Sequence, residues 1–182
     1  SRIAAFVETG GTFVATYWSG IVDENDLVFQ GGFPGGALRD VMGIWAEEID
    51  ALYEDDRNRV VPEPGTPLGL KGPYEARDYC DLIHSEGAEV LARYGEDFYA
   101  GRPALTVNAY GNGRAYTIAS NNDDAFLGDF YGALDADLAL KRALDTPLPH
   151  GVTAQLRTDG ERDFVFLMNF NDALTTVDLG AE

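Results

Sequence analysis

The chain has 182 residues, 45% of them hydrophobic and 24% charged, a balance that predicts a globular protein with one well-buried domain, or one domain and a small appendage. Its 13 basic and 31 acidic side chains give a net charge of −18, which disfavours nucleic acid and anionic membrane surfaces as partners but is compatible with neutral sugars. No apolar run approaches the roughly 20 residues of a membrane-spanning helix, so we expect no membrane partner either.

The first 17 residues predict a helix followed by a buried strand. Residues 2–8 carry their apolar side chains on one helical face, and Gly10-Gly11 ends the helix. Residues 12–17 are almost wholly apolar, which is typical of a strand covered on both faces of a sheet. In a doubly wound fold such a helix crosses over from an earlier strand, which does not precede residue 2. We therefore expect an open α/β sheet that begins part-way through, in a fragment of a longer chain.

The middle of the chain predicts a short helix and a series of strands. Residues 38–42 fit a helix, and residues 44–52 fit a strand, with a helix as the competing interpretation. Four prolines within residues 54–73 indicate a loop. Further strands are expected at 74–83, 88–94, 104–110 and 114–118, the last two joined by the hairpin turn Gly111-Asn112-Gly113.

The last third predicts one long helix and a second, small domain. Residues 122–144 fit a helix with Asn122 or Asp123 as N-cap and an apolar face of Phe126, Phe130, Leu134 and Leu138. Prolines at 147 and 149 then separate two expected domains, 1–146 and 147–182. The second alternates at 152–157, 164–170 and 175–179 like an antiparallel meander, whose three strands cannot bury both faces of a sheet by themselves.

Two segments have the outline of ligand-binding loops but lack essential residues. The glycine run 31–36 has phosphate-loop spacing, but Ala37 and Leu38 stand where a lysine and a hydroxyl residue are needed. The acidic run 23–26 could open a calcium loop, but Val28 and Pro34 replace its glycine and its glutamate. Adjacent carboxylates on one loop also cannot easily flank a sugar from opposite faces. We therefore predict no metal site, no cofactor and no catalytic residue.

The sequence does not indicate an enzymatic nucleophile. Cys80 lies in a predicted strand without the flanking glycines of a nucleophile elbow, and Asp78 and Asp81 would raise the pKa of its thiol. No motif links Ser19 to the histidines of the chain, His84 and His150. A single cysteine excludes an internal disulfide, which favours a cytoplasmic location.

A series of short motifs carries a family resemblance over essentially the whole chain. In order, they are Ser19-Gly-Ile-Val-Asp-Glu24, Gly31-Gly-Phe-Pro-Gly35, Tyr99-Ala-Gly-Arg-Pro-Ala104, Tyr110-Gly-Asn-Gly-Arg-Ala-Tyr116 and Leu148-Pro-His-Gly-Val152. The series resembles the non-catalytic trimerisation domain of bacterial β-galactosidases of glycoside hydrolase family 42.

The resemblance implies a fold, and it implies that catalysis and assembly belong to different domains. The fold would be an incomplete doubly wound, flavodoxin-like sheet of the class I glutamine amidotransferase type, followed by a short antiparallel β segment that begins the C-terminal domain. The family hydrolyses terminal non-reducing β-D-galactosides with retention, using two glutamates of an N-terminal barrel. No position here matches either glutamate. We therefore expect an inactive fragment whose partners are identical subunits in a homotrimer, with galactoside bound only by the absent barrel.

The loop from Trp18 to Phe33 is the expected trimer contact, because aromatic and acidic side chains at one end of a sheet suit the core and rim of an interface. Its candidate interface residues are Trp18, Asp23, Glu24, Asp26, Phe29 and Phe33. The alternative for the three aromatic residues is packing within the domain. Two other functions stay open: a carbohydrate-binding or sugar-sensing α/β module, which requires an exposed aromatic platform, and a divergent amidotransferase-like hydrolase, against which the missing cysteine elbow argues.

Overall fold

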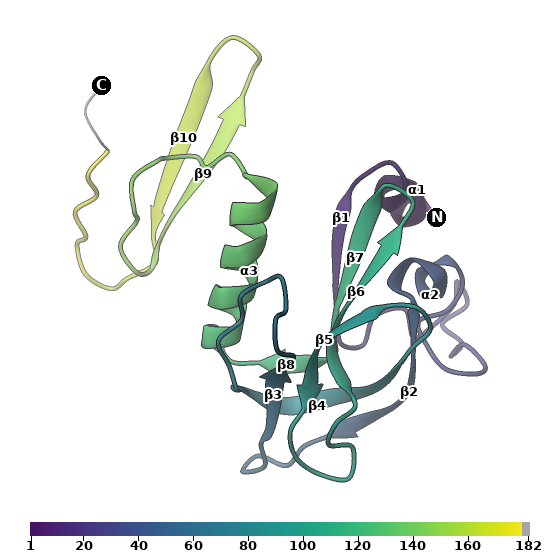
Figure 1. Cartoon of the computed structure of the whole chain (residues 1–182). Coiled ribbons are helices and arrows are strands. Elements are labelled where there is room, and N and C mark those ends of the chain that lie inside the picture. The colour runs from purple at the N-terminus through teal and green to yellow at the C-terminus, as the bar shows by residue number, and fades with distance from the viewer. Residues whose placement is uncertain (180–182) are drawn as a thin grey trace. The chain divides into compact units, whose positions relative to one another are not determined.

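A computed structural model describes residues 1–179 and divides into two compact units, Ser1–Leu134 and Asp135–Glu182 (Figure 1). The first unit is built on an eight-stranded sheet. Seven strands lie in the order β1-β7-β6-β5-β3-β4-β2, and β8 pairs with β4. Their bounds are β1 Thr12–Thr16, β2 Ile44–Ala51, β3 Asn58–Pro62, β4 Tyr74–Ser85, β5 Glu89–Tyr94, β6 Pro103–Tyr110, β7 Gly113–Ile118 and β8 Ser120–Asn122.

The expected α/β class is confirmed, and within it the sheet is mainly antiparallel. Only β1 and β7 pair in parallel, with Thr12 opposite Arg114 and Thr16 opposite Ile118. The strands from β2 to β8 are joined by turns and loops without the crossover helices that parallel neighbours require. The doubly wound character is therefore confined to the N-terminal edge, where α1 (Arg2–Glu8) precedes β1.

Helix α1 and strand β1 form as the sequence predicts. Ser1 caps the helix, its hydroxyl accepting the Ala4 N–H at 3.2 Å, and Val7 is fully buried. Gly113 opens β7 beneath the end of this helix, where an added Cβ would lie 2.2 Å from the Val7 carbonyl oxygen. Strand β1 is at the edge of the sheet, and only Ala15 of its five residues is buried. It is thus less covered than its apolar sequence indicates.

The segment after helix α2 (Ala37–Met42) is a strand, which settles the competing predictions for residues 44–52. Strand β2 pairs with β4 and has a bulge between Ala46 and Glu48. Two strands were not predicted. Strand β3 lies within the proline-rich segment because Pro62, which has no N–H, stands at its last position. Strand β8 has only three residues and carries no periodic signal.

Helix α3 (Asp124–Leu138) covers the sheet with a face of large aromatic residues. Phe126 and Phe130 are fully buried and lie edge-on against Tyr74 and Tyr116, with ring centroids 5.3 and 5.5 Å apart. Asp123 is the N-cap, since its Oδ1 accepts the Phe126 N–H at 2.8 Å. The helix ends six residues earlier than predicted, because Ala139 turns into the left-handed region at φ 47° and the residues beyond Leu134 bury too little apolar surface to extend it.

The second unit contains one antiparallel hairpin, β9 (Val152–Thr158) and β10 (Asp163–Asn169). Its turn includes Asp159 and Gly160, as predicted. The predicted strand at 175–179 is wrong, because these residues have no regular secondary structure. Four consecutive apolar residues of β10 stay exposed: Phe164, Val165, Phe166 and Leu167. None of the helices in the described part of the chain is long and apolar enough to cross a membrane.

The buried face of α3 gives a test of the core. We expect Phe126→Ala to lower the free energy of unfolding of this unit by about 3–5 kcal/mol, because the truncation leaves a cavity against Tyr74 and Phe130. Leu127→Ala, at the neighbouring position that is 37% exposed, is the matched control and should cost much less. Urea denaturation of the full-length protein followed by tryptophan fluorescence measures both. Equal losses for the two variants would contradict this packing.

Candidate interaction surface

The loop of residues 17–36 leads from β1 to α2 (Figure 1), and backbone hydrogen bonds tie its base together and to the sheet. At its neck the Gly35 N–H donates to the Gly20 carbonyl at 3.0 Å. Phe33 forms an antiparallel bridge with Ala46 of β2, donating its N–H at 3.2 Å. These bonds fix the beginning and the end of the loop, so that the intervening residues project as one ordered unit.

Trp18 lies at the base of this loop in a constrained conformation. Its φ is 62°, in the left-handed region that side-chain-bearing residues rarely adopt. Its N–H donates to Asp81 Oδ2 at 3.0 Å, across 63 positions of sequence. The indole ring contacts the Tyr79 ring at 4.7 Å between centroids, yet the residue stays 49% exposed. The sheet thus holds a large aromatic side chain at the surface.

The tip of the loop is a tight turn organised by one carboxylate. Asp23 Oδ1 accepts the N–H groups of Asn25 at 2.8 Å and Leu27 at 3.0 Å. A bridge between Val22 and Val28 continues the turn into a miniature hairpin. Because these backbone bonds hold the tip, its apolar side chains point outward without collapsing: Val22, Leu27 and Val28 are 44%, 64% and 59% exposed.

The six predicted interface residues fall into three groups. Trp18, Glu24 and Asp26 are exposed, and Asp23 is partly buried, with its carboxylate used by the turn. Phe29 is half-buried against Gly35, where an added Cβ would lie 2.0 Å from the Phe29 ring. Phe33 is 8% exposed and belongs to the hydrophobic core. Phe33 therefore packs within the domain, which was the alternative for the aromatic residues, and cannot be an exposed contact of this chain.

Three exposed residues of the surface were missed in the sequence: Val22, Leu27 and Val28. The available signal was an apolar pair, Leu27-Val28, placed directly after an acidic turn where solvated residues are usual. The roles of Tyr79 and Asp81 had no local signal, because both depend on β4 lying beside the base of the loop.

Asp81 is the most unusual charged residue of the unit. It is 4% exposed, and Oδ1 has no hydrogen-bond partner in the described structure, whereas Oδ2 accepts the Trp18 N–H. Burial raises the pKa of this carboxyl to about 6, against the opposing effect of the Trp18 hydrogen bond. Among the described residues, only burial and the Trp18 hydrogen bond shift this pKa, and no cation contributes.

Cys80 beside it is fully buried, and burial raises the pKa of its thiol to about 11, with smaller contributions from Asp50 and Asp81. Of the two predicted acidic neighbours, Asp81 contributes to this shift and Asp78 does not, and Asp50 contributes in its place. Cys80 therefore stays an uncharged thiol at neutral pH and cannot act as a nucleophile.

Ser19 is not part of a catalytic triad in this structure. Its hydroxyl donates to the Thr16 carbonyl at 2.7 Å. His84 stacks on Trp45 with ring centroids 4.4 Å apart, and its Nε2 lies 2.8 Å from Glu47 Oε2. His150 belongs to the other unit. The contacts of Ser19 and His84 are therefore local and structural.

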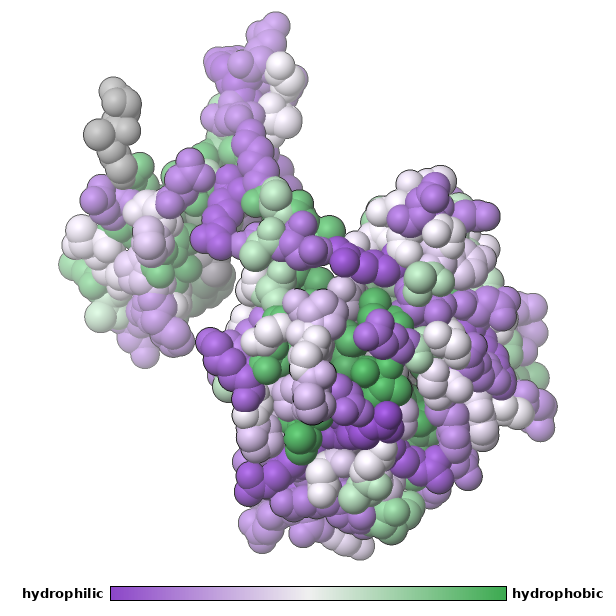
Figure 2. Space-filling view, in the orientation of Figure 1, coloured by the Kyte–Doolittle hydropathy of each residue, from purple (hydrophilic) through white to green (hydrophobic). Residues whose placement is uncertain are grey.

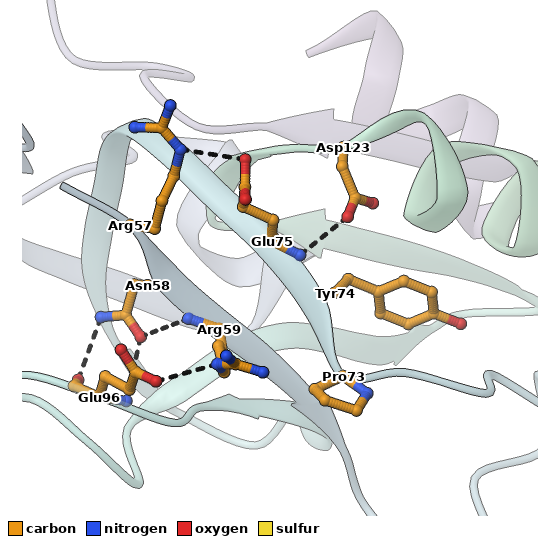
Figure 3. A pocket seen from close by; sticks show the side chains of 8 residues that line it. All are labelled: Arg57, Asn58, Arg59, Pro73, Tyr74, Glu75, Glu96 and Asp123. Carbon is orange, nitrogen blue, oxygen red and sulfur yellow. Dashed lines mark hydrogen bonds and ion pairs between the residues drawn. The ribbon is translucent and has the colours of Figure 1, made fainter. Parts of the chain in front are cut away.

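A polar depression of about 250 Å³ lies between β3, β4 and the start of α3 (Figure 3). Its arginines are paired, Arg57 with Glu75 at 3.0 Å and Arg59 with Glu96 at 2.9 Å. Tyr74, the only aromatic residue among its lining residues, is 5% exposed and offers no open ring face. The depression therefore lies where β3 and β4 meet, and its lining residues offer no exposed aromatic ring on which a sugar could stack.

Within residues 1–179, no three side chains of His, Cys, Asp or Glu gather closely enough to hold a metal ion. The visible molecular surface is largely hydrophilic, with hydrophobic residues in separate patches (Figure 2). The loop 17–36 combines exposed apolar side chains with an ordered backbone, as strand β10 also does, and this combination is suited to contact with another protein surface.

Comparison with known families identifies the two domains of the chain. A family model described as the β-galactosidase trimerisation domain matches residues 1–141, and one described as the β-galactosidase C-terminal domain matches residues 151–182. The chain is 60% identical over 178 residues to β-galactosidase Pbg of Clostridium perfringens, and 54% identical over 169 residues to BglY of Alicyclobacillus acidocaldarius. These alignments cover 98% and 93% of the chain but 26% and 24% of the relatives, so the chain spans about a quarter of their length.

Solved structures show the same fold. The β-galactosidase of Rahnella sp. R3 superposes with a TM-score of 0.86 at 60% identity, and that of Bacillus circulans sp. alkalophilus with 0.84 at 48% identity. Each match covers 93% of this chain and 25% of the solved chain. The chain therefore belongs to the β-galactosidase trimerisation-domain family of glycoside hydrolase family 42.

Proposed function

We propose that this chain is the non-catalytic assembly portion of a longer β-galactosidase that hydrolyses terminal β-D-galactosides as a homotrimer of identical subunits. The support is that a trimerisation-domain match covers residues 1–141 and that the relatives are about four times longer. We place the domain boundary at 146/147, between the segments that match the two family models. A single buried thiol suits a reducing compartment, and we propose a cytoplasmic location.

The observation that carries the proposed interface is the ordered, apolar loop 17–36. Trp18, Leu27 and Val28 are exposed although the backbone around them is hydrogen-bonded. The acidic residues Glu24 and Asp26 flank them and would form the solvated rim. We propose that Trp18 and the loop tip are the apolar anchors of the three-fold contact, while Phe29 and Phe33 support the loop from inside the domain.

Electrostatics sets a condition on this assembly. Each 182-residue portion carries a net charge of −18, so three copies of it repel one another. Buried apolar area must overcome that repulsion, and salt screens charges separated by more than about 10 Å at 0.1 M ionic strength. The proposed trimer should therefore be tighter at higher salt, which is the reverse of an interface held by opposite charges.

Our first functional prediction concerns activity. Retaining glycosidases need two carboxyl groups about 5 Å apart across the scissile bond, and the family resemblance assigns both to the barrel. The purified 182-residue chain should therefore release no nitrophenol from a nitrophenyl β-galactoside. A preparation of the full-length enzyme serves as the positive control. Release in proportion to the concentration of the chain would contradict the assignment.

Our second prediction concerns assembly. Truncation of a buried aromatic anchor costs about 2 kcal/mol or more at each contact, so Trp18→Ala in the full-length enzyme should shift trimers toward monomers. Light scattering over a dilution series measures this shift. Tyr53→Ala is the matched control, since Tyr53 is 83% exposed but lies outside the loop. If the combined truncation of Trp18, Leu27 and Val28 left the trimer intact, the interface would lie elsewhere.

The carbohydrate-binding alternative depends on the same half-exposed Trp18, whose ring is supported by Tyr79. It makes a different prediction: galactose or lactose should then quench the fluorescence of Trp18 in a saturable manner. Under the assembly proposal, sugar has no effect on this residue and protein dilution does.

A further inference from the structure

The underside of the loop 17–36 contains a carboxylate in an unfavourable setting. Asp81 is 4% exposed, and only Oδ2 has a partner, the Trp18 N–H at 3.0 Å. Oδ1 is buried and unpaired. A buried charged oxygen without a partner is costly, because the protein does not replace the hydrogen bonds that water would make.

The space around Asp81 is closed by the loop on one side and by the sheet on the other. A cavity of about 10 Å³ lies there, room for at most one water molecule. Ser19, Phe33 and Pro34 of the loop line it, opposite Ile83 and Thr117 of the sheet. The Thr117 hydroxyl is likewise buried without a partner. Since the loop contributes part of the wall, opening the loop would admit water to Asp81.

Within residues 1–179, Asp81 has no partner that titrates near neutral pH. The other residues that line the cavity are uncharged. Two titratable groups sense its charge, the Cys80 thiol and the Tyr94 hydroxyl, and burial raises the pKa of both well above neutrality. Asp50, on the far side of Cys80, accepts the Tyr99 hydroxyl at 2.8 Å. Between pH 5 and pH 8 the protonation of this pocket is therefore that of Asp81.

We propose that Asp81 is a proton-binding site that controls the seating of the loop 17–36: protonation favours the closed loop, and ionisation favours its opening. This inference rests on the proposed function for its consequence, namely that the trimer contact is better formed at mildly acidic pH. The seating of the loop itself does not depend on that function.

The sign follows from linkage. In the closed loop, burial raises the pKa of Asp81 to about 6. In an opened loop the carboxyl is solvated, and its pKa returns toward the ordinary value of about 3.9. The closed state therefore binds the proton more tightly, so closure is favoured as the pH falls through 6 and is penalised above it. Between pH 8 and pH 5 this difference changes the opening equilibrium by about tenfold.

Hydrogen exchange tests the proposal in the full-length protein. The fraction of open loop is obtained from peptides covering residues 17–29 by mass spectrometry at pH 8 and pH 5, after correction for the chemical exchange rate. We expect opening to fall about tenfold in the unmodified protein. In Asp81→Asn, opening should be independent of pH and already low at pH 8, because the amide is uncharged and can still accept the Trp18 N–H.

Asp56→Asn, which removes an exposed carboxylate, is the matched control and should keep the tenfold response. The proposal is overturned if Asp81→Asn keeps that response, or if the unmodified loop opens more at pH 5. Thr117→Val is a second variant, in case Asp81→Asn fails to fold. It makes the cavity less polar and should move the midpoint of the response to higher pH, whereas an unchanged midpoint would also overturn the proposal.

Light scattering on the same samples separates the two proposals. If loop opening depends on Asp81 but the trimer survives Trp18→Ala, the proposed interface is wrong and the proton site stands. If Trp18→Ala dissociates the trimer, but the loop of Asp81→Asn responds to pH as the unmodified loop does, the proposed proton site is wrong and the proposed interface stands.

Discussion

The arrangement of residues 1–134 depends on one strand, β4, which pairs with three others. It runs antiparallel to β2, β3 and β8, and it can do so because its register shifts between Arg77 and Cys80. Asp78, within that shift, has a φ of 60° and re-aims the strand. The Asp81 N–H is then bonded to the Ala119 carbonyl at 2.7 Å. The residues that hold the loop, Tyr79 and Asp81, thus stand on the most extensively paired strand of the sheet.

This placement explains how a surface loop can be ordered without burying its own apolar residues. A loop usually gains its order from side chains that turn inward. Here the backbone is held at both ends and at Trp18, so Leu27 and Val28 remain outside. In the proposed interface, part of the ordering entropy is therefore spent during folding and not at association. An uncompensated carboxylate beneath the loop is the cost of that arrangement.

The sequence predicted local structure well wherever the signal was local. The hairpin of β6 and β7 follows from Gly111-Asn112-Gly113, and the start of α3 follows from Asp123. Strands β3 and β8 could not be recognised, because they are strands only by virtue of pairing with β4 and β5. Which residues of the loop 17–36 are exposed was only partly predictable from the sequence. Phe33 and Leu27 are both apolar, and only the bridge to Ala46 distinguishes the buried residue from the exposed one.

The carboxylate of Asp123 has a geometric consequence for α3. One oxygen accepts the Phe126 N–H of the helix at 2.8 Å, and the other accepts the Glu75 N–H of β4 at 2.9 Å. A single side chain therefore sets both the height at which the helix starts above the sheet and its rotation about its own axis. A shift of one residue would turn the helix by about 100° and break both bonds together. These two hydrogen bonds thus fix the rotation of the aromatic face of α3 independently of the contacts that Phe126 and Phe130 make.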